Sequence, residues 1–160
     1  MNDYIESTAV ISSCTNYRYL LRRVWDRDRI RVLFIMLNPS TADAEVDDPT
    51  IKSCVRLCKE NNFGALEVVN LFGLRATNPE ELLESDDPVG PRNFDIITAA
   101  MSRCDLYICA WGAHKMADQQ KKEVLELVTR PAVFCFGLTK ESAPKHPLYI
   151  KSGTPLVVYA

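Results

Sequence analysis

The stretch FIMLNPSTAD at residues 34–43 joins a buried strand to a polar turn. The apolar run over residues 32–37 is followed at once by four polar or turn-forming residues: Asn38, Pro39, Ser40 and Thr41. In open α/β sheets, ligands bind outside the carboxyl ends of the strands. Pro39 biases Asn38 toward an extended backbone, so its amide should project from the strand end. These four residues therefore predict a binding site at the end of a core strand.

Short apolar runs of the same kind recur along the chain and alternate with helical patterns. Core strands are expected at residues 30–37, 65–72, 106–111 and 132–136, and helices at 49–62, 79–83, 94–104 and 115–129. Such alternation is typical of a parallel sheet with helices on both faces. We therefore predict a single domain over residues 1–160, a three-layer α/β/α sandwich with a central four-stranded parallel sheet.

An N-terminal hairpin should add antiparallel strands at one edge of this sheet. Its strands are expected at residues 7–12 and 17–25, and a last edge strand at 156–159. Strict alternation in the second hairpin strand would put Arg18 on the same face as Leu20.

Composition sets limits on the function. The formal net charge is −2, which argues against a protein that coats long nucleic acid by bulk electrostatics. The longest apolar runs are shorter than a membrane span, and the first residues lack the basic and apolar regions of a signal peptide. We therefore expect a cytoplasmic location and no membrane partner.

The cysteines indicate core packing. They are Cys14, Cys54, Cys58, Cys104, Cys109 and Cys135. A reducing cytosol keeps such residues as thiols, and neither a CxxC pair nor a Cys/His cluster with zinc spacing occurs. We expect neither a metal nor another cofactor.

Two amides and an imidazole are expected near strand ends: Asn38, Asn70 and His146. An Asn side chain offers a donor and an acceptor, which suits the edge of a nucleobase. Histidine can donate to a carbonyl that gains negative charge. Together these residues favour a pocket that recognises a nucleobase. The alternative is structural: Asn38 caps a turn, Asn70 joins a buried network and His146 lies in a plain loop.

Further candidates surround these three. Asp43 is a carboxylate that could assist a water molecule, or a turn residue beside a helix. Phe72 and Trp111 could stack on a base, or belong to the core. Lys140 and Lys145, on either side of a loop after Gly137, could meet a phosphate, or be solvated.

The ordered motifs resemble those of the uracil-DNA glycosylase superfamily. They are Asn38-Pro39, VVNLF at 68–72, RATNPEEL at 75–82 and HPL at 146–148. The mismatch-specific branch has a similar Asn-Pro motif, and other branches carry a His-Pro pair. The whole chain, above all LNPSTAD at 37–43 and KHPLY at 145–149, looks closer still to a bacterial and phage family catalogued as a domain of unknown function.

The glycosylase resemblance implies roles for three residues. Asn38 would position or activate water, Asn70 would read the base, and His146 would support the leaving base. Met36 and Ser40 stand where the superfamily has glycines, and the larger side chain at 40 narrows the approach of a sugar–phosphate backbone. Residues 148–151 could serve as the superfamily's base-flipping wedge, although this segment is short.

The sequence leaves three functions open. One is an N-glycosidase acting on a base in DNA or in a nucleotide. Another is a non-catalytic module that binds a nucleotide or nucleic acid. The last is an enzyme that processes modified bases. Each has a nucleobase-containing small molecule or nucleic acid as its partner, and the fold does not decide between them.

Overall fold

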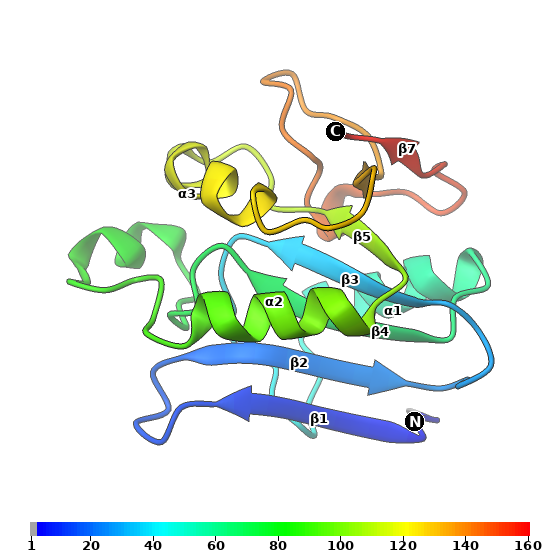
Figure 1. The fold of residues 1–160 in the computed structure, drawn as a ribbon, viewed down its shortest axis with the longest axis horizontal. Coiled ribbons are helices and arrows are strands. Elements are labelled where there is room, and N and C mark those ends of the chain that lie inside the picture. The colour runs from blue at the N-terminus through cyan, green and yellow to red at the C-terminus, as the bar shows by residue number, and fades with distance from the viewer. Residues whose placement is uncertain (1–2) are drawn as a thin grey trace.

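A seven-stranded mixed sheet forms the centre of the fold in the computed structural model, which describes residues 3–160 (Figure 1). The strands are β1 (Glu6–Ile11), β2 (Arg18–Val24), β3 (Arg31–Met36), β4 (Ala65–Asn70), β5 (Leu106–Cys109), β6 (Phe134–Cys135) and β7 (Val157–Val158). Their order across the sheet is β1-β2-β4-β3-β5-β6-β7. The expected α/β class is confirmed.

The sheet is larger and more mixed than the four-stranded parallel sheet expected from the sequence. β3 pairs in parallel with β4 and β5, and β5 pairs in parallel with β6. The β1–β2 hairpin extends this set because β2 pairs antiparallel with β4. At the other edge, β7 pairs antiparallel with β6 through Phe134 and Val158. One continuous mixed sheet is the result.

Helices cover both faces of the sheet (Figure 1). They are α1 (Pro49–Glu60), α2 (Asn93–Arg103) and α3 (Lys115–Leu125), with short 3₁₀ helices η1 (Pro79–Glu84) and η2 (Pro147–Tyr149). Alternate residues of β3 serve the two faces. Phe34 packs in a core cluster with Ile51 of α1, whereas Ile35 packs in a second cluster with Ile97 of α2 and Met116 of α3.

The two ends of α1 are fixed in different ways. At its start, the Asp48 carboxylate accepts a hydrogen bond from the Ile51 amide at 2.9 Å. After its end, Asn62, with φ of 60°, takes the left-handed conformation that a glycine most often supplies after a helix. The nearby Gly64 has a different role, since a Cβ there would lie 2.0 Å from the Asp26 carbonyl oxygen.

A β-bulge in β2 redirects Arg18. The register runs from Val10 opposite Leu20 to Ile11 opposite Arg18 and so skips a residue of β2. Leu20 packs on the α2 side of the sheet, yet the Arg18 guanidinium donates to the Ala42 carbonyl on the α1 side. The prediction that Arg18 shares a face with Leu20 is therefore wrong, because a bulge breaks the two-residue period.

The cysteines are all free thiols, and five of them are buried. Only Cys14 is exposed. Within residues 3–160, no group of His, Cys, Asp and Glu side chains is arranged to hold a metal ion. Across the same residues, every helix is too short or too polar to cross a bilayer.

Candidate functional site

A cavity of about 530 Å³ opens beyond the carboxyl ends of the parallel strands. The segments that follow β3, β4 and β5 line it, together with the N-terminus of α1 and with η2. This is the edge at which open α/β sheets bind ligands, and the volume falls in the range of small-molecule pockets.

The cavity brings together five of the residues predicted from the sequence. They are Asn38, Ser40, Thr41, Trp111 and His146. Six others are absent from its lining: Pro39, Asp43, Asn70, Phe72, Lys140 and Lys145. The sequence therefore predicted the place of the pocket better than its full set of residues.

The amide of Asn38 is held by the loops after β3 and β4. Its Nδ2 donates to the Ala76 carbonyl at 2.8 Å and to the Pro39 carbonyl at 3.1 Å. Its Oδ1 forms no hydrogen bond within the described chain. Asn38 thus bridges two turns and also lines the cavity, while its contact with a ligand stays a prediction.

His146 is the N-cap of η2 and has its proton fixed in position. Its Nδ1 accepts a hydrogen bond from the Leu148 amide at 3.3 Å. A neutral ring that accepts at Nδ1 carries its proton on Nε2. Burial lowers the pKa of His146, an effect that the charge of Asp48 partly opposes. The side chain is therefore a neutral Nε2–H donor near neutral pH.

The lining also holds charged and polar side chains that were missed as site candidates, among them Arg18, Asp48 and His114, and it holds Tyr149, which was expected only as part of the wedge at 148–151. Asp48 is the N-cap of α1. Like His146, His114 caps a helix, accepting from the Met116 amide at 3.2 Å, and its Nε2 lies 3.3 Å from the Glu80 carboxylate. It follows β5, so the carboxyl-end rule that found Asn38 could have found it.

Aromatic side chains differ in how much ring they offer to a ligand. Trp111 is 2% exposed and packs edge-on against Tyr159. Phe72 is buried in the same core cluster. Tyr149, in contrast, is 77% exposed at the cavity. The exposed ring able to stack on a ligand is thus that of Tyr149.

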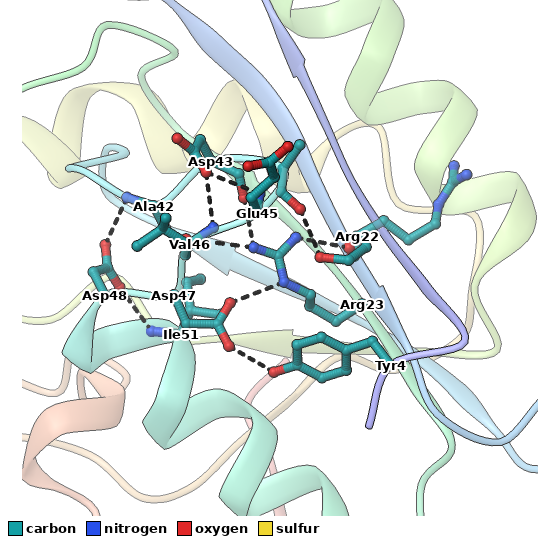
Figure 2. A network of polar contacts seen from close by, with 12 residues as sticks. Tyr4, Arg22, Arg23, Ala42, Asp43, Glu45, Val46, Asp47, Asp48 and Ile51 are labelled. Carbon is teal, nitrogen blue, oxygen red and sulfur yellow. Dashed lines mark hydrogen bonds and ion pairs between the residues drawn. The ribbon is translucent and has the colours of Figure 1, made fainter. Parts of the chain in front are cut away.

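A network of polar contacts fixes the loop that carries Asp48 (Figure 2). The fully buried Arg23 donates from Nε to Asp47 at 2.9 Å, and from Nη2 to the Asp43 and Val46 carbonyls. The hydroxyl of Tyr4 donates to Asp47 at 2.6 Å. These contacts hold the loop before α1 against β2, so Asp48 is positioned by the fold.

Asp43 is part of this loop and serves the turn. Its carboxylate accepts from the Glu45 and Val46 amides, and these bonds lower its pKa. The carboxylate that lines the cavity is Asp48. Asp48 accepts from the Ile51 amide and, at 3.3 Å, from the Ala42 amide.

Asn70 lies beside the cavity lining but is not part of it. It is the cross-strand neighbour of Met36, which lines the cavity. Asn70 is 1% exposed, and neither its amide oxygen nor its amide nitrogen has a hydrogen-bond partner within residues 3–160. A buried structural network around this side chain, the alternative from the sequence, is therefore absent from the described part of the chain.

The two lysines lie outside the cavity lining. Lys140 is exposed on the loop after β6. Lys145 is half-buried, and its side chain passes the position where a Cβ on Gly137 would stand. The loop position expected for them is observed, while their contact with a ligand stays a prediction.

Comparison with known proteins gives a family and no activity. A family model described as "Protein of unknown function (DUF1643)" matches residues 18–148. No curated protein and no solved structure matches the chain. The expected membership in a family of unknown function is confirmed, whereas the resemblance to uracil-DNA glycosylases stays a prediction.

Proposed function

This chain belongs to the DUF1643 family, and we propose that its cavity binds a nucleobase-containing ligand and hydrolyses the N-glycosidic bond of that ligand. The observation that carries the proposal is the pairing of an oriented donor and an oriented acceptor in one cavity. His146 presents Nε2–H, and Asn38 presents Oδ1. The donor of His146 suits a carbonyl acceptor of a nucleobase, and the acceptor of Asn38 suits a water molecule at the sugar.

The fold is compatible with this activity. Four parallel strands, β4, β3, β5 and β6, run through the middle of the sheet, and helices lie on both faces. We propose that this part of the sheet is the uracil-DNA glycosylase-like core, extended by antiparallel strands at both edges. The Asn-Pro and His-Pro motifs would then lie at one edge of it, as the resemblance implies.

The chemistry assigned to the site is dissociative. The bond from the anomeric carbon to the base nitrogen breaks and leaves its electron pair on the base, while a water oxygen bonds to the anomeric carbon. Asp48 accepts the proton that this water loses and then releases it to solvent, from which the base anion takes up a proton. His146 stabilises the negative charge on the base through Nε2–H. A preorganised donor of this kind is typically worth ~3 kcal/mol of barrier.

Asn38 and Tyr149 take supporting roles in this proposal. The Oδ1 of Asn38 accepts a hydrogen bond from the attacking water and so orients it; the amide itself is too weak a base to take the proton. The exposed ring of Tyr149 stacks on the base. Asn70 lies outside the cavity lining, beside Met36, so its reading of the base requires the ligand to reach past the lining to this unpaired amide.

The test is a release assay with the full chain. Purified protein is incubated with uracil-, hypoxanthine- and mismatch-containing oligonucleotides, single- and double-stranded, and with free nucleotides and nucleosides. We expect free base to appear, and the Asp48→Asn variant to release it at least about 100-fold more slowly. Asp43→Asn, in the same loop but outside the cavity, is the matched control and should keep wild-type turnover. Binding without release would support the module instead, and neither binding nor release would overturn the proposal.

A further inference from the structure

Strand β2 carries two buried arginines, one of which uses its hydrogen-bond donors fully while the other leaves most of them unused. Arg23 is 0% exposed, donates from all three guanidinium nitrogens, and pairs with Asp47. Arg18 is 1% exposed, and its guanidinium forms one hydrogen bond, from Nη1 to the Ala42 carbonyl at 3.0 Å. Its Nε is buried without a partner. No carboxylate among residues 3–160 forms an ion pair with it.

This contrast needs a cause, because an unpaired buried charge is costly. Arg23 is explained by the loop that it holds. Arg18 is not, since a single carbonyl leaves most of its donors unused. Burial lowers the pKa of Arg18 to about 10, so the group is still charged at neutral pH. A charged guanidinium with free donors is suited to an anion that binds from outside the protein.

The cavity is the route by which an anion reaches Arg18. Arg18 belongs to the cavity lining, and the β-bulge in β2 is what turns it to the α1 side of the sheet. A regular strand would have pointed this side chain toward α2. Bulges often re-aim one side chain next to a binding site, and this bulge places a guanidinium at the wall of the cavity.

The surroundings of Arg18 also favour negative charge. The N-terminus of α1, with Thr50 and Ile51 in the lining, directs the positive end of a twelve-residue helix at the cavity. Hydroxyl groups of four lining residues form no hydrogen bond within the described chain: Ser40, Thr41, Thr50 and Thr77. Asp48 is the opposing charge, and it partly compensates Arg18 by raising its pKa, whereas Arg75 adds a second positive charge that lowers it.

We infer that the cavity holds a phosphate group on Arg18, so that its ligand is a nucleotide with a terminal phosphate and not a nucleoside. This inference rests on the proposed function for the base, although phosphate binding itself does not depend on it. A guanidinium that is 1% exposed suits a group that ends in the cavity. An internal phosphodiester would have to continue on both sides of it. The volume of about 530 Å³ suits a ligand of nucleotide size.

The decisive experiment compares ligands on the wild-type protein by isothermal titration calorimetry. The probes are inorganic phosphate, a panel of nucleosides, and the corresponding nucleoside 5′-monophosphates, with sodium chloride at equal ionic strength as the blank. We expect saturable phosphate binding and at least about tenfold tighter binding of each bound monophosphate than of its nucleoside. Equal affinity of the two, or no saturable phosphate binding, overturns the inference.

Variants then assign the effect to Arg18. Arg18→Gln removes the charge and should weaken phosphate binding by about 10- to 100-fold, with nucleoside binding unchanged. Arg18→Lys keeps the charge and should lose less. Arg27→Gln is the matched control, because Arg27 is exposed in the turn before β3 and outside the cavity lining. Wild-type phosphate affinity in a folded Arg18→Gln protein contradicts the assignment.

The two proposals can fail separately. Base release that is indifferent to the phosphate would refute the phosphate site and leave the glycosidase. Phosphate binding that depends on Arg18, without binding or release of any base, would refute the glycosidase and leave an anion site. Monophosphates should bind Arg18→Gln more weakly than the wild type, whereas an oligonucleotide should bind both proteins equally tightly. This result would support a site for a terminal phosphate.

Discussion

Replacement of Asn38 by aspartate tests whether this amide is oriented as the structure has it. Nδ2 donates to two carbonyls, Ala76 at 2.8 Å and Pro39 at 3.1 Å. The new side chain in Asn38→Asp would be nearly the same size but would turn a carboxylate oxygen toward both carbonyls. In glycosylase-like sites an aspartate in this motif could activate water, so sequence resemblance alone would favour a gain of activity. The structure predicts a loss.

The magnitude follows from the two bonds. A net hydrogen bond is worth about 1 kcal/mol, so Asn38→Ala should lower the free energy of unfolding by about 2 kcal/mol. Asn38→Asp loses the same bonds and adds a carboxylate facing carbonyl oxygens, which should cost about 1–3 kcal/mol more. For a chain of this length, each kcal/mol lowers Tm by about 2–4 °C. The aspartate variant should therefore melt well below the alanine variant at neutral pH.

Acid should reverse part of this loss. A protonated carboxyl can donate to the Ala76 carbonyl, so the fold should raise the pKa of the carboxyl introduced by Asn38→Asp. A raised folded pKa means that the folded state binds the proton more tightly, so the penalty shrinks as pH falls through that pKa. Urea unfolding followed by tryptophan fluorescence, at several pH values, measures the effect.

Asn61 supplies the control for these variants. Its Nδ2 donates to the Leu57 carbonyl at 2.8 Å, at the end of α1 and away from the cavity. Asn61→Ala should lose about 1 kcal/mol and keep full base release, whereas both Asn38 variants should lose release. An Asn38→Asp protein as stable as the wild type at neutral pH would refute the amide orientation. Full turnover in either Asn38 variant would refute its role in holding water.

Three further predictions follow from single contacts. His146 should titrate below the usual value near 6.5 in an NMR titration, because burial lowers its pKa. As pH falls, the unfolded chain takes up the proton first, so the free energy of unfolding should fall below about pH 6.5. The His146→Gln variant should show a weaker pH dependence. Arg23→Met should lower the free energy of unfolding by about 3–5 kcal/mol, measured in urea, because it removes one member of a buried ion pair. A loss under about 1 kcal/mol would contradict this. Tyr149→Ala should leave Tm within about 2 °C but weaken nucleoside binding at least about tenfold, since its exposed ring contributes to the cavity and little to the core.

Local patterns in the sequence were enough to predict the α/β class and the position of the cavity. The apolar run before Asn38 had to be a strand, and the polar turn after it had to lie at the carboxyl edge. His146 reaches the same cavity because it lies on the chain after β6, which runs parallel to β5 in the same sheet. The rule that ligands bind at the carboxyl ends of parallel strands was therefore enough to place both residues at one site.

The bulge in β2 could not be predicted in this way. A bulge needs no particular residue type, so the sequence of β2 does not reveal it, and Arg18 fits an ordinary alternating pattern. The same limit applies to Asp48: an aspartate just before Pro49 is typical of a helix N-cap, but the sequence does not mark it as a cavity residue. Its position at the cavity depends on how the loop before α1 packs against β2. Arg23 of β2 holds that loop in place, and it lies in a different element, earlier in the sequence. Hydrophobic periodicity along the sequence does not predict long-range contacts of this kind.

Capping and ligand contact fall on the same side chains in this cavity. Asp48 caps α1, His114 caps α3 and His146 caps η2, and all three line the cavity. Each cap accepts a backbone N–H of its own helix, so the fold already fixes its rotamer and, for a neutral histidine, its tautomer. A ligand then meets polar groups that need not be ordered on binding, which favours affinity and transition-state stabilisation alike. For the same reason, a substitution at any of these caps must change stability and activity together, and only a variant matched for the lost cap can separate the two effects.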